Sequence, residues 1–206
     1  MAALTRERIL DCAVAMADRD GLDAVTLRRI AGELGVHVTS LYNHVETRDA
    51  ITDGIVDTLL DQAHLPTTSV DWEEWVRTFF GAMSALASRH PGAFAALSRR
   101  PVQGARAAAS FEVAMAAFAS AGLSPGDAYS AVKAAVFTAL MVGAERSMLA
   151  RGEMSETVMA DLPPASFPQF HALEGHDPSQ AWSFSLETLV AGLRVQTEAH
   201  SRAGGS

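Results

Sequence analysis

Cysteine is nearly absent from this chain, which holds a single one, Cys12, among its 206 residues. One cysteine cannot form an intramolecular disulfide, and its scarcity is typical of a reducing compartment. Half of the residues are hydrophobic, which is ample material for a core. Because Cys12 lies on the apolar stripe of the first predicted helix, we expect a buried and inert thiol rather than a reactive one.

The chain also lacks the hydrophobic runs that a membrane protein or a secreted precursor would show. Its longest apolar run without charge, residues 134–144, is too short to span a bilayer. No basic segment followed by an apolar stretch opens the sequence, as it would in a signal peptide. We therefore expect a cytoplasmic protein with no membrane partner.

Positive charge is scarce as well, with 16 Lys and Arg against 24 Asp and Glu and a net charge of −8. This balance argues against a non-specific coat on nucleic acid. The deficit is uneven, because residues 1–48 hold six arginines and seven acidic residues, and residues 49–206 carry a net charge of −7. The nearly neutral N-terminal segment permits a local DNA-binding surface.

The motifs of several enzyme classes are missing, including glycine-rich phosphate loops, Gly-x-Ser-x-Gly and His-Glu-x-x-His. Ser130 and Lys133 fit the Ser-x-x-Lys pattern of penicillin-recognising enzymes, but the chain has no Ser-Asp-Asn or Lys-Thr-Gly partner. His171 and His176 share a proline-containing loop with no third metal ligand nearby. We expect neither an enzyme nor a cofactor or metal.

What the chain does show is helical periodicity throughout its first part, broken by short turns. Thr5 and Thr26 stand where N-caps would precede the first two helices, and a glycine follows each helix. A third short helix is predicted over residues 38–44 and a fourth over residues 47–64. No alternation of apolar and polar residues persists, so an all-α fold is expected.

The second half is predicted to hold longer helices after a break at residues 65–69. Asp71 and Glu74 form a capping box for a helix that reaches Arg89. Three further helices are predicted over residues 101–121, 125–151 and 179–200, with a proline-containing loop before the last. The expected domains are a DNA-binding unit at 1–48, joined by the helix at 47–64, and a ligand-binding and dimerisation unit at 65–206.

The third predicted helix has the composition of a DNA-recognition helix. Three short helices with a glycine-bearing turn between the second and third describe a helix-turn-helix. Val38, Leu41 and Val45 gather on one side of a helical wheel, where we expect them to pack against Ile30 and Leu34. The other side is small, polar and uncharged, which suits close approach to bases and phosphates. That side comprises Thr39, Ser40, Tyr42 and Asn43.

Individual side chains around this helix have the chemistry of DNA contacts. Asn43 is the only asparagine in the chain and can pair with adenine, although a solvated surface amide is the alternative. Arg28 can reach phosphate or guanine from the second helix, and a solvated basic face is its alternative. Tyr42, His44 and Arg48 can hydrogen-bond phosphates, but for His44 a capping or core role fits equally.

Residues 25–36 and 41–45 together resemble the signature of the TetR family of transcriptional regulators, in which Leu-Tyr-x-His marks the recognition helix. Residues 47–51 match the start of the fourth helix of that family. The C-terminal part is similar to the tetracycline-repressor subgroup at Trp72, at His90-Pro91-Gly92 and at Arg100-Pro101. The resemblance implies a homodimeric repressor that reads a palindromic DNA operator and joins its subunits through the last two long helices.

The resemblance also implies a set of DNA contacts. Carried over residue by residue, they fall on Thr26, Arg28, Val38, Thr39, Ser40, Tyr42, Asn43, His44 and Arg48. Val38 replaces a base-reading glutamine of the tetracycline repressors. A valine can touch a thymine methyl but cannot hydrogen-bond, so we expect a different operator sequence.

A small-molecule effector is expected to bind among the helices of the second half. The candidate residues are His64, Phe79, Met83, Arg100, Gln103, Phe111, Met115, Phe137 and Met141. Most of the apolar members have core packing as their alternative role. Ala96 stands where the tetracycline repressors have a metal-binding histidine, so we expect a largely apolar effector and no required metal.

A second functional hypothesis comes from a different class. A helical protein that binds small molecules without sequence-specific DNA binding would share the second half of this chain. The polar outer face of the third helix favours the DNA-binding regulator.

Overall fold

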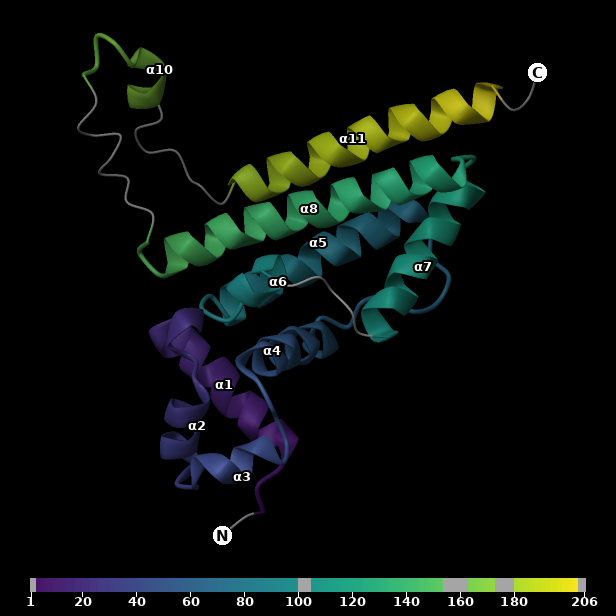
Figure 1. Ribbon diagram of the computed structural model, residues 1–206. Helices are drawn as coiled ribbons and strands as arrows, with labels where there is room; N and C mark the ends of the chain where they lie inside the picture. Colours follow the sequence, from purple (N-terminus) through teal and green to yellow (C-terminus); the bar gives the residue numbers. More distant parts are fainter. Residues whose placement is uncertain (1–2, 100–104, 154–162, 173–179, 204–206) are drawn as a thin grey trace.

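The computed structural model describes residues 3–99, 105–153, 163–172 and 180–203 (Figure 1). All regular elements in these ranges are helical, which confirms the expected all-α class with an N-terminal helix-turn-helix and a larger helical part. In chain order they are α1 (Arg6–Asp20), η1 (Leu22–Ala24), α2 (Leu27–Leu34), α3 (Val38–Tyr42), α4 (Arg48–Gln62), α5 (Trp72–Arg89), α6 (Ala95–Arg99), α7 (Ala105–Ser120), α8 (Pro125–Ala150), α10 (Pro168–His171) and α11 (Gln180–Ala203).

The helix boundaries follow the capping residues. Thr5 and Thr26 cap α1 and α2, since their hydroxyl oxygens accept from the backbone N–H groups three residues ahead at 3.3 Å. Gly35 ends α2 in the left-handed region at φ 66°, which an L side chain rarely adopts. Asp71 caps α5 by accepting from the N–H of Glu74 at 2.9 Å. These caps were all predicted from the sequence.

Several expectations differ from the structure. The third helix ends at Tyr42, so residues 43–44 form a turn. The start of the helix predicted at Pro101 lies outside the described residues, and α7 is described from Ala105 onward. Cys12 is only half-buried, with Sγ 3.7 Å from a carboxylate oxygen of Glu33. Partial burial and, after it, the Glu33 charge raise the pKa of the thiol.

The helices form two regions that share one continuous core. Figure 1 shows α1, α2 and α3 at one end, with α4 leading from them towards α5. In the larger region α8 packs along α5, α7 and α11, and α11 lies on its outer side. Large side chains that are almost fully buried fill this region, among them Trp75, Phe80, Met83, Phe94 and Phe118. In the described part of the chain, no helix combines the length and apolarity that a membrane crossing needs.

The two regions meet at a joint around Asp18 of α1. One carboxylate oxygen of Asp18 accepts from the N–H groups of Gly92 and Ala93, at 3.1 and 2.9 Å. The other oxygen lies 2.7 Å from Nδ1 of His90, whose Nε2 is 2.9 Å from Oε1 of Gln62. These hydrogen bonds join α1 to the end of α4 and to the turn between α5 and α6.

Gly92 allows this joint to close, because a Cβ at this position would lie 1.9 Å from the backbone oxygen of Ala17. We expect Gly92→Ala to lower the free energy of unfolding by about 1–3 kcal/mol, since backbone atoms must move. Gly81→Ala is the control: nothing lies within 4 Å of its Cβ position inside α5, and alanine should stabilise that helix by about 0.5–1 kcal/mol. Urea denaturation of both variants tests this; equal effects would contradict it.

Candidate functional site

The helix-turn-helix is held by the apolar side of α3. Leu41 and Val45 are buried at 0% and 2% exposure, and Ile30 of α2 is fully buried beside them. Val38 and Leu34 are half-buried and packed against the same core. The packing predicted from the helical wheel is thus confirmed, and it fixes which side of α3 faces solvent.

The solvent side of α3 carries the predicted DNA-contact residues. Thr39, Tyr42, Asn43 and His44 are exposed, while Ser40 is half-buried. Tyr42 keeps 49% of its surface accessible, so its ring and hydroxyl are open to a binding partner. The face therefore presents hydroxyl and amide groups without charge, as the wheel predicted.

His37 is a residue that the sequence reasoning missed. It stands at the N-cap of α3, and its Nδ1 lies 2.8 Å from the hydroxyl of Thr39. The contact fixes the orientation of a hydroxyl that belongs to the predicted DNA-contact set. Its position directly before the predicted helix at Val38 is the one sign of a capping role in the sequence. Histidine is not among the usual N-cap residues, so the sequence alone did not reveal that role.

The arginines of the set differ in their surroundings. Arg28 is exposed on α2, and no partner of its guanidinium occurs among the described residues. Nη2 of Arg48 donates to the backbone oxygen of Asp23 at 3.3 Å and lies 3.6 Å from its carboxylate. Asp23 also receives Nη1 of Arg99 at 2.7 Å, which lowers the pKa of Asp23. Arg48, a candidate contact to a DNA phosphate, is therefore linked through Asp23 to α6.

A cluster of charged residues fastens α1 to α2. Arg19 pairs with Asp20 at 2.9 Å and also with Glu33, and Arg29 pairs with Asp20. The hydrogen bond from Arg19 is the main cause that lowers the pKa of both carboxyl groups. The cluster is solvent-exposed, so its role is to set the position of α2 rather than to add much stability.

Four of the predicted effector residues lie in or against the core of the second region. Phe79 and Met83 of α5 are buried, and the Phe79 ring stacks on Trp75 with 5.0 Å between centroids. Phe111 and Met115 of α7 are half-buried and packed against that core. Arg100 and Gln103 fall outside the described residues.

The structure does not bring the other three predicted effector residues into this group. His64 is exposed at the end of α4, with a positive φ of 49°. Phe137 and Met141 lie on the outer surface of α8 and are 55% and 66% exposed. Because α8 is apolar nearly all round, periodicity could not distinguish its inner face from its outer face.

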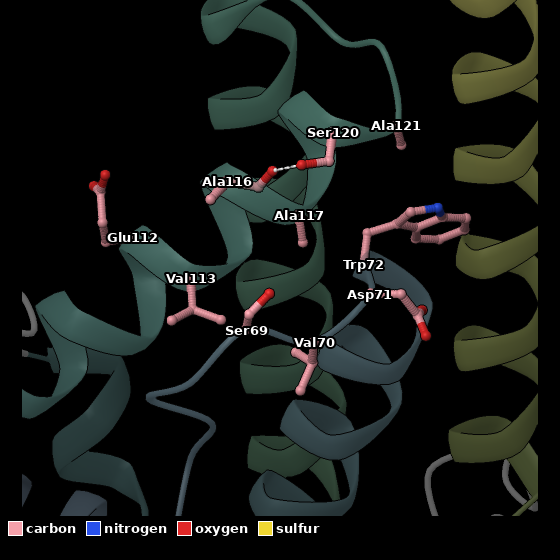
Figure 2. A pocket seen from close by; sticks show the side chains of 10 residues that line it. All are labelled: Ser69, Val70, Asp71, Trp72, Glu112, Val113, Ala116, Ala117, Ser120 and Ala121. Atoms are coloured by element: carbon pink, nitrogen blue, oxygen red, sulfur yellow. Dashed lines mark hydrogen bonds between the residues drawn. The ribbon is translucent and has the colours of Figure 1, made fainter.

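A cavity of about 530 Å³ opens between the start of α5 and one face of α7. Figure 2 shows Val70, Val113 and Ala117 within it, whereas the indole of Trp72 extends towards α11 and stacks on Phe118 with 5.4 Å between centroids. Ser120 also lines the cavity, but its hydroxyl donates to the backbone oxygen of Ala116 at 2.9 Å. None of the predicted effector residues lines this cavity.

Comparison with curated proteins finds regulators of transcription. The chain is 36% identical over 129 residues to an HTH-type transcriptional regulator of Saccharopolyspora erythraea, a match that covers 62% of the chain and 55% of that protein. It is 28% identical over 207 residues to the class D tetracycline repressor protein of Escherichia coli, which covers 97% of the chain and 93% of the repressor. No family model matches the chain.

Among solved structures, the chain is similar to ActR of Streptomyces coelicolor. The apo form of that protein superposes with a TM-score of 0.77 at 27% identity, over 97% of this chain and 99% of ActR. ActR is described as a TetR family protein and has also been solved in complex with actinorhodin. The relatives named here are regulators of transcription rather than enzymes.

The charge cluster between α1 and α2 predicts a dependence on acid. Arg19 lowers the pKa of Asp20 from 3.8 and that of Glu33 from 4.5, so the stabilisation is complete above pH 5 and is lost as pH falls through the lowered values. Without the Asp20 carboxylate, less stabilisation can be lost in acid. We therefore expect the free energy of unfolding to decrease less between pH 5 and pH 3 in Asp20→Asn than in the parent protein.

Asp11→Asn is the matched control, because it removes an exposed carboxylate from the same helix and leaves the Asp20 cluster intact. Urea denaturation at stepped pH, followed by circular dichroism, measures both variants. Identical pH profiles for Asp20→Asn and the parent protein would contradict the role assigned to the cluster.

Proposed function

Because the chain belongs to the TetR family of transcriptional regulators, we propose that it is a repressor that binds a palindromic operator as a homodimer and leaves it when a small molecule binds. The observation that carries the proposal is the solvent side of α3, which exposes uncharged hydrogen-bonding side chains, while Leu41 and Val45 on the opposite side are buried. Such a protein would act in the cytoplasm, where the DNA lies.

The proposed DNA contacts are the nine residues implied by the family signature. Thr39, Tyr42 and Asn43 can approach base edges and phosphates from α3, because their side chains are exposed. Arg28 in the first turn of α2 and Arg48 at the start of α4 supply positive charge for contacts with the phosphate backbone. We propose that Val38 contributes an apolar contact, which would favour a thymine at its position.

The proposed dimer is supported by an exposed apolar stripe on the last long helix. Phe184 and Val195 of α11 are 75% and 64% exposed, and the small residues Ala191 and Gly192 lie between them on the same side. Phe137 and Met141 form a second exposed apolar group on α8, which lies beside α11. Apolar side chains of this size rarely remain in water without a partner, and two copies could cover both groups.

The proposed effector site lies among the core helices, where Phe79, Met83, Phe111 and Met115 are placed. Aromatic and methionine side chains can adapt to a mostly apolar ligand. ActR, a relative with the same fold, has been solved with actinorhodin bound. Ala96 is fully buried where the tetracycline repressors have a metal ligand, so we propose that the effector binds without a metal.

Operator binding is tested with Tyr42→Phe, which removes only a hydroxyl. We expect the affinity for a duplex from the protein's own promoter region to fall about threefold to tenfold, as a lost hydrogen bond predicts. Tyr129→Phe is the matched control, because it alters the other tyrosine, which is 51% exposed on α8. Fluorescence anisotropy with labelled DNA measures both.

Asn43→Ala should in addition relax the preference at one base-pair position, since an asparagine contact contributes about 1–3 kcal/mol of discrimination. Unchanged binding by Tyr42→Phe and Asn43→Ala alike would support the alternative, a helical small-molecule-binding protein without sequence-specific DNA binding.

The dimer is tested with Phe184→Glu, which would place a carboxylate of each subunit in the apolar contact. We expect the dimer dissociation constant to rise at least about tenfold, because a buried unpaired charge is costly. Ser183→Glu adds the same charge to the neighbouring exposed position, outside the stripe, and should leave the dimer intact. Sedimentation velocity over a range of concentrations decides; a monomeric parent protein would refute the proposed dimer.

A further inference from the structure

A short hydrogen bond joins the side chains of His37 and Thr39 at the start of α3. Nδ1 of the His37 ring lies 2.8 Å from the hydroxyl oxygen of Thr39. The same nitrogen accepts from the backbone N–H of Thr39, at 3.5 Å. Both side chains are exposed, and Thr39 belongs to the proposed DNA contacts. The direction in which this hydrogen bond runs therefore decides which groups of DNA Thr39 can bind.

The backbone contact indicates which side chain donates. A neutral histidine ring carries a proton on one nitrogen, while its other nitrogen accepts. The N–H of Thr39 points at Nδ1, so a proton on Nδ1 would face a second proton, whereas a bare Nδ1 can accept. The proton of the ring is then on Nε2, and the Thr39 hydroxyl donates to Nδ1 across the 2.8 Å contact.

A hydroxyl whose hydrogen is engaged in this way can only accept further hydrogen bonds. A threonine hydroxyl has one hydrogen and two lone pairs. With the hydrogen directed at His37, only the lone pairs of Thr39 remain for DNA. By contrast, the hydroxyls of Ser40 and Tyr42 have no hydrogen-bond partner within the described part of the chain, so each can still donate. This difference distinguishes Thr39 from the other two hydroxyls of α3.

The polar groups of DNA divide along the same line. Phosphate oxygens, O6 and N7 of guanine and O4 of thymine are acceptors, which cannot pair with an oxygen that offers only lone pairs. The donors of the major groove are the amino groups of adenine, at N6, and of cytosine, at N4. An oxygen that only accepts therefore matches adenine or cytosine.

We propose that His37 is a positioning residue for base selection: it holds the Thr39 hydroxyl as an acceptor, and Thr39 then selects adenine or cytosine on the DNA strand that it faces. The inference rests on the proposed operator binding and narrows the role of Thr39 within it. Contact with DNA excludes water from the bond between the two side chains, and a hydrogen bond in a drier environment is costlier to reverse.

The tautomer of His37 is tested on the full-length protein without DNA. Two-bond nitrogen–proton correlation spectra of protein labelled with ¹⁵N in histidine distinguish the two neutral tautomers. The signal that is missing in His37→Asn identifies His37 among the seven histidines. We expect the proton of the neutral ring on Nε2. A proton mainly on Nδ1 would overturn the proposal, whatever the protein does with DNA.

Base selection is tested with a duplex that the protein itself selects from a random library. Thr39→Val replaces the hydroxyl by a methyl group, and the base-pair position whose preference it changes is the one that Thr39 contacts. Four duplexes that differ only there, in one half-site, are compared by fluorescence anisotropy. We expect the parent to bind adenine or cytosine about threefold to tenfold more tightly than thymine or guanine, as one hydrogen bond predicts.

Two variants of His37 separate positioning from a general effect on α3. His37→Ala removes the acceptor, so the Thr39 hydroxyl can turn and donate, and the discrimination should be lost. His37→Asn places an amide oxygen near the position of Nδ1 and is a favourable N-cap, so the discrimination should be kept. In the Thr39→Val background, His37→Ala should not change the base preference further. Because the readout is a ratio of affinities, a loss of folded protein does not alter it.

Discrimination that survives in His37→Ala, or that His37→Asn abolishes as well, would overturn the proposal. A parent preference for thymine or guanine, or a Thr39→Val variant that changes no position, would overturn it too. Enrichment of an operator whose preference does not depend on His37 would refute this inference alone. If the library yielded no enriched duplex, operator binding itself would fail, and the base selection with it.

Discussion

The carboxylate of Asp18 holds the two regions of this protein together. It accepts two backbone N–H groups, from Gly92 and Ala93, and its other oxygen contacts His90. Hydrogen bonds to an ionised group are stronger than those between neutral groups. Here they converge on the Asp18 carboxylate, which is partly buried together with the ring of His90. The close contact between Gly92 and the backbone of Ala17 leaves no room for the turn between α5 and α6 to shift along α1. The position of α1, and hence of α3, is therefore tied to the turn that starts α6.

This joint makes α6 one element, beside α4, through which the two regions can affect each other. On one side Arg99 of α6 pairs with Asp23, which also contacts Arg48. On the other side α6 packs on α8, and the preceding Phe94 is fully buried against Gly143. A ligand that displaces α6 would therefore act on Asp23, and through it on a proposed phosphate ligand. Coupling of this kind requires that the ligand bind the two placements of α6 with different affinity.

The sequence predicted what depends on local chemistry. Thr5, Thr26 and Asp71 were identified as caps because a side-chain oxygen satisfies N–H groups only a few residues away. Leu41 and Val45 were placed in the core because one helix has one apolar side. The predicted class and the helix-turn-helix followed from such signals, repeated along the chain.

What escaped prediction depends on contacts between distant residues. Asp18 and His90 are separated by 72 positions, and nothing in either segment marks them as partners. Cys12 lies on an apolar stripe but beside Glu33 of another helix, so it is half-buried rather than buried. Phe137 and Met141 were expected near an effector, since α8 is apolar on all sides and its outer face cannot be recognised without its neighbours.

The orientation of α11 connects the proposed dimer to the rest of the fold. Arg77 of α5 pairs with Glu187 of α11 at 2.6 Å, and Arg194 of α11 pairs with Glu73 of α5 at 2.6 Å. Exposed ion pairs add little stability, but two of them two turns apart define how the helix is rotated about its axis. With this polar side turned to α5, Val190 and Leu193 enter the core, and Phe184 and Val195 must face outward. In the proposed dimer, the distance between the two copies of α3 then depends on this rotation and on the Asp18 joint together.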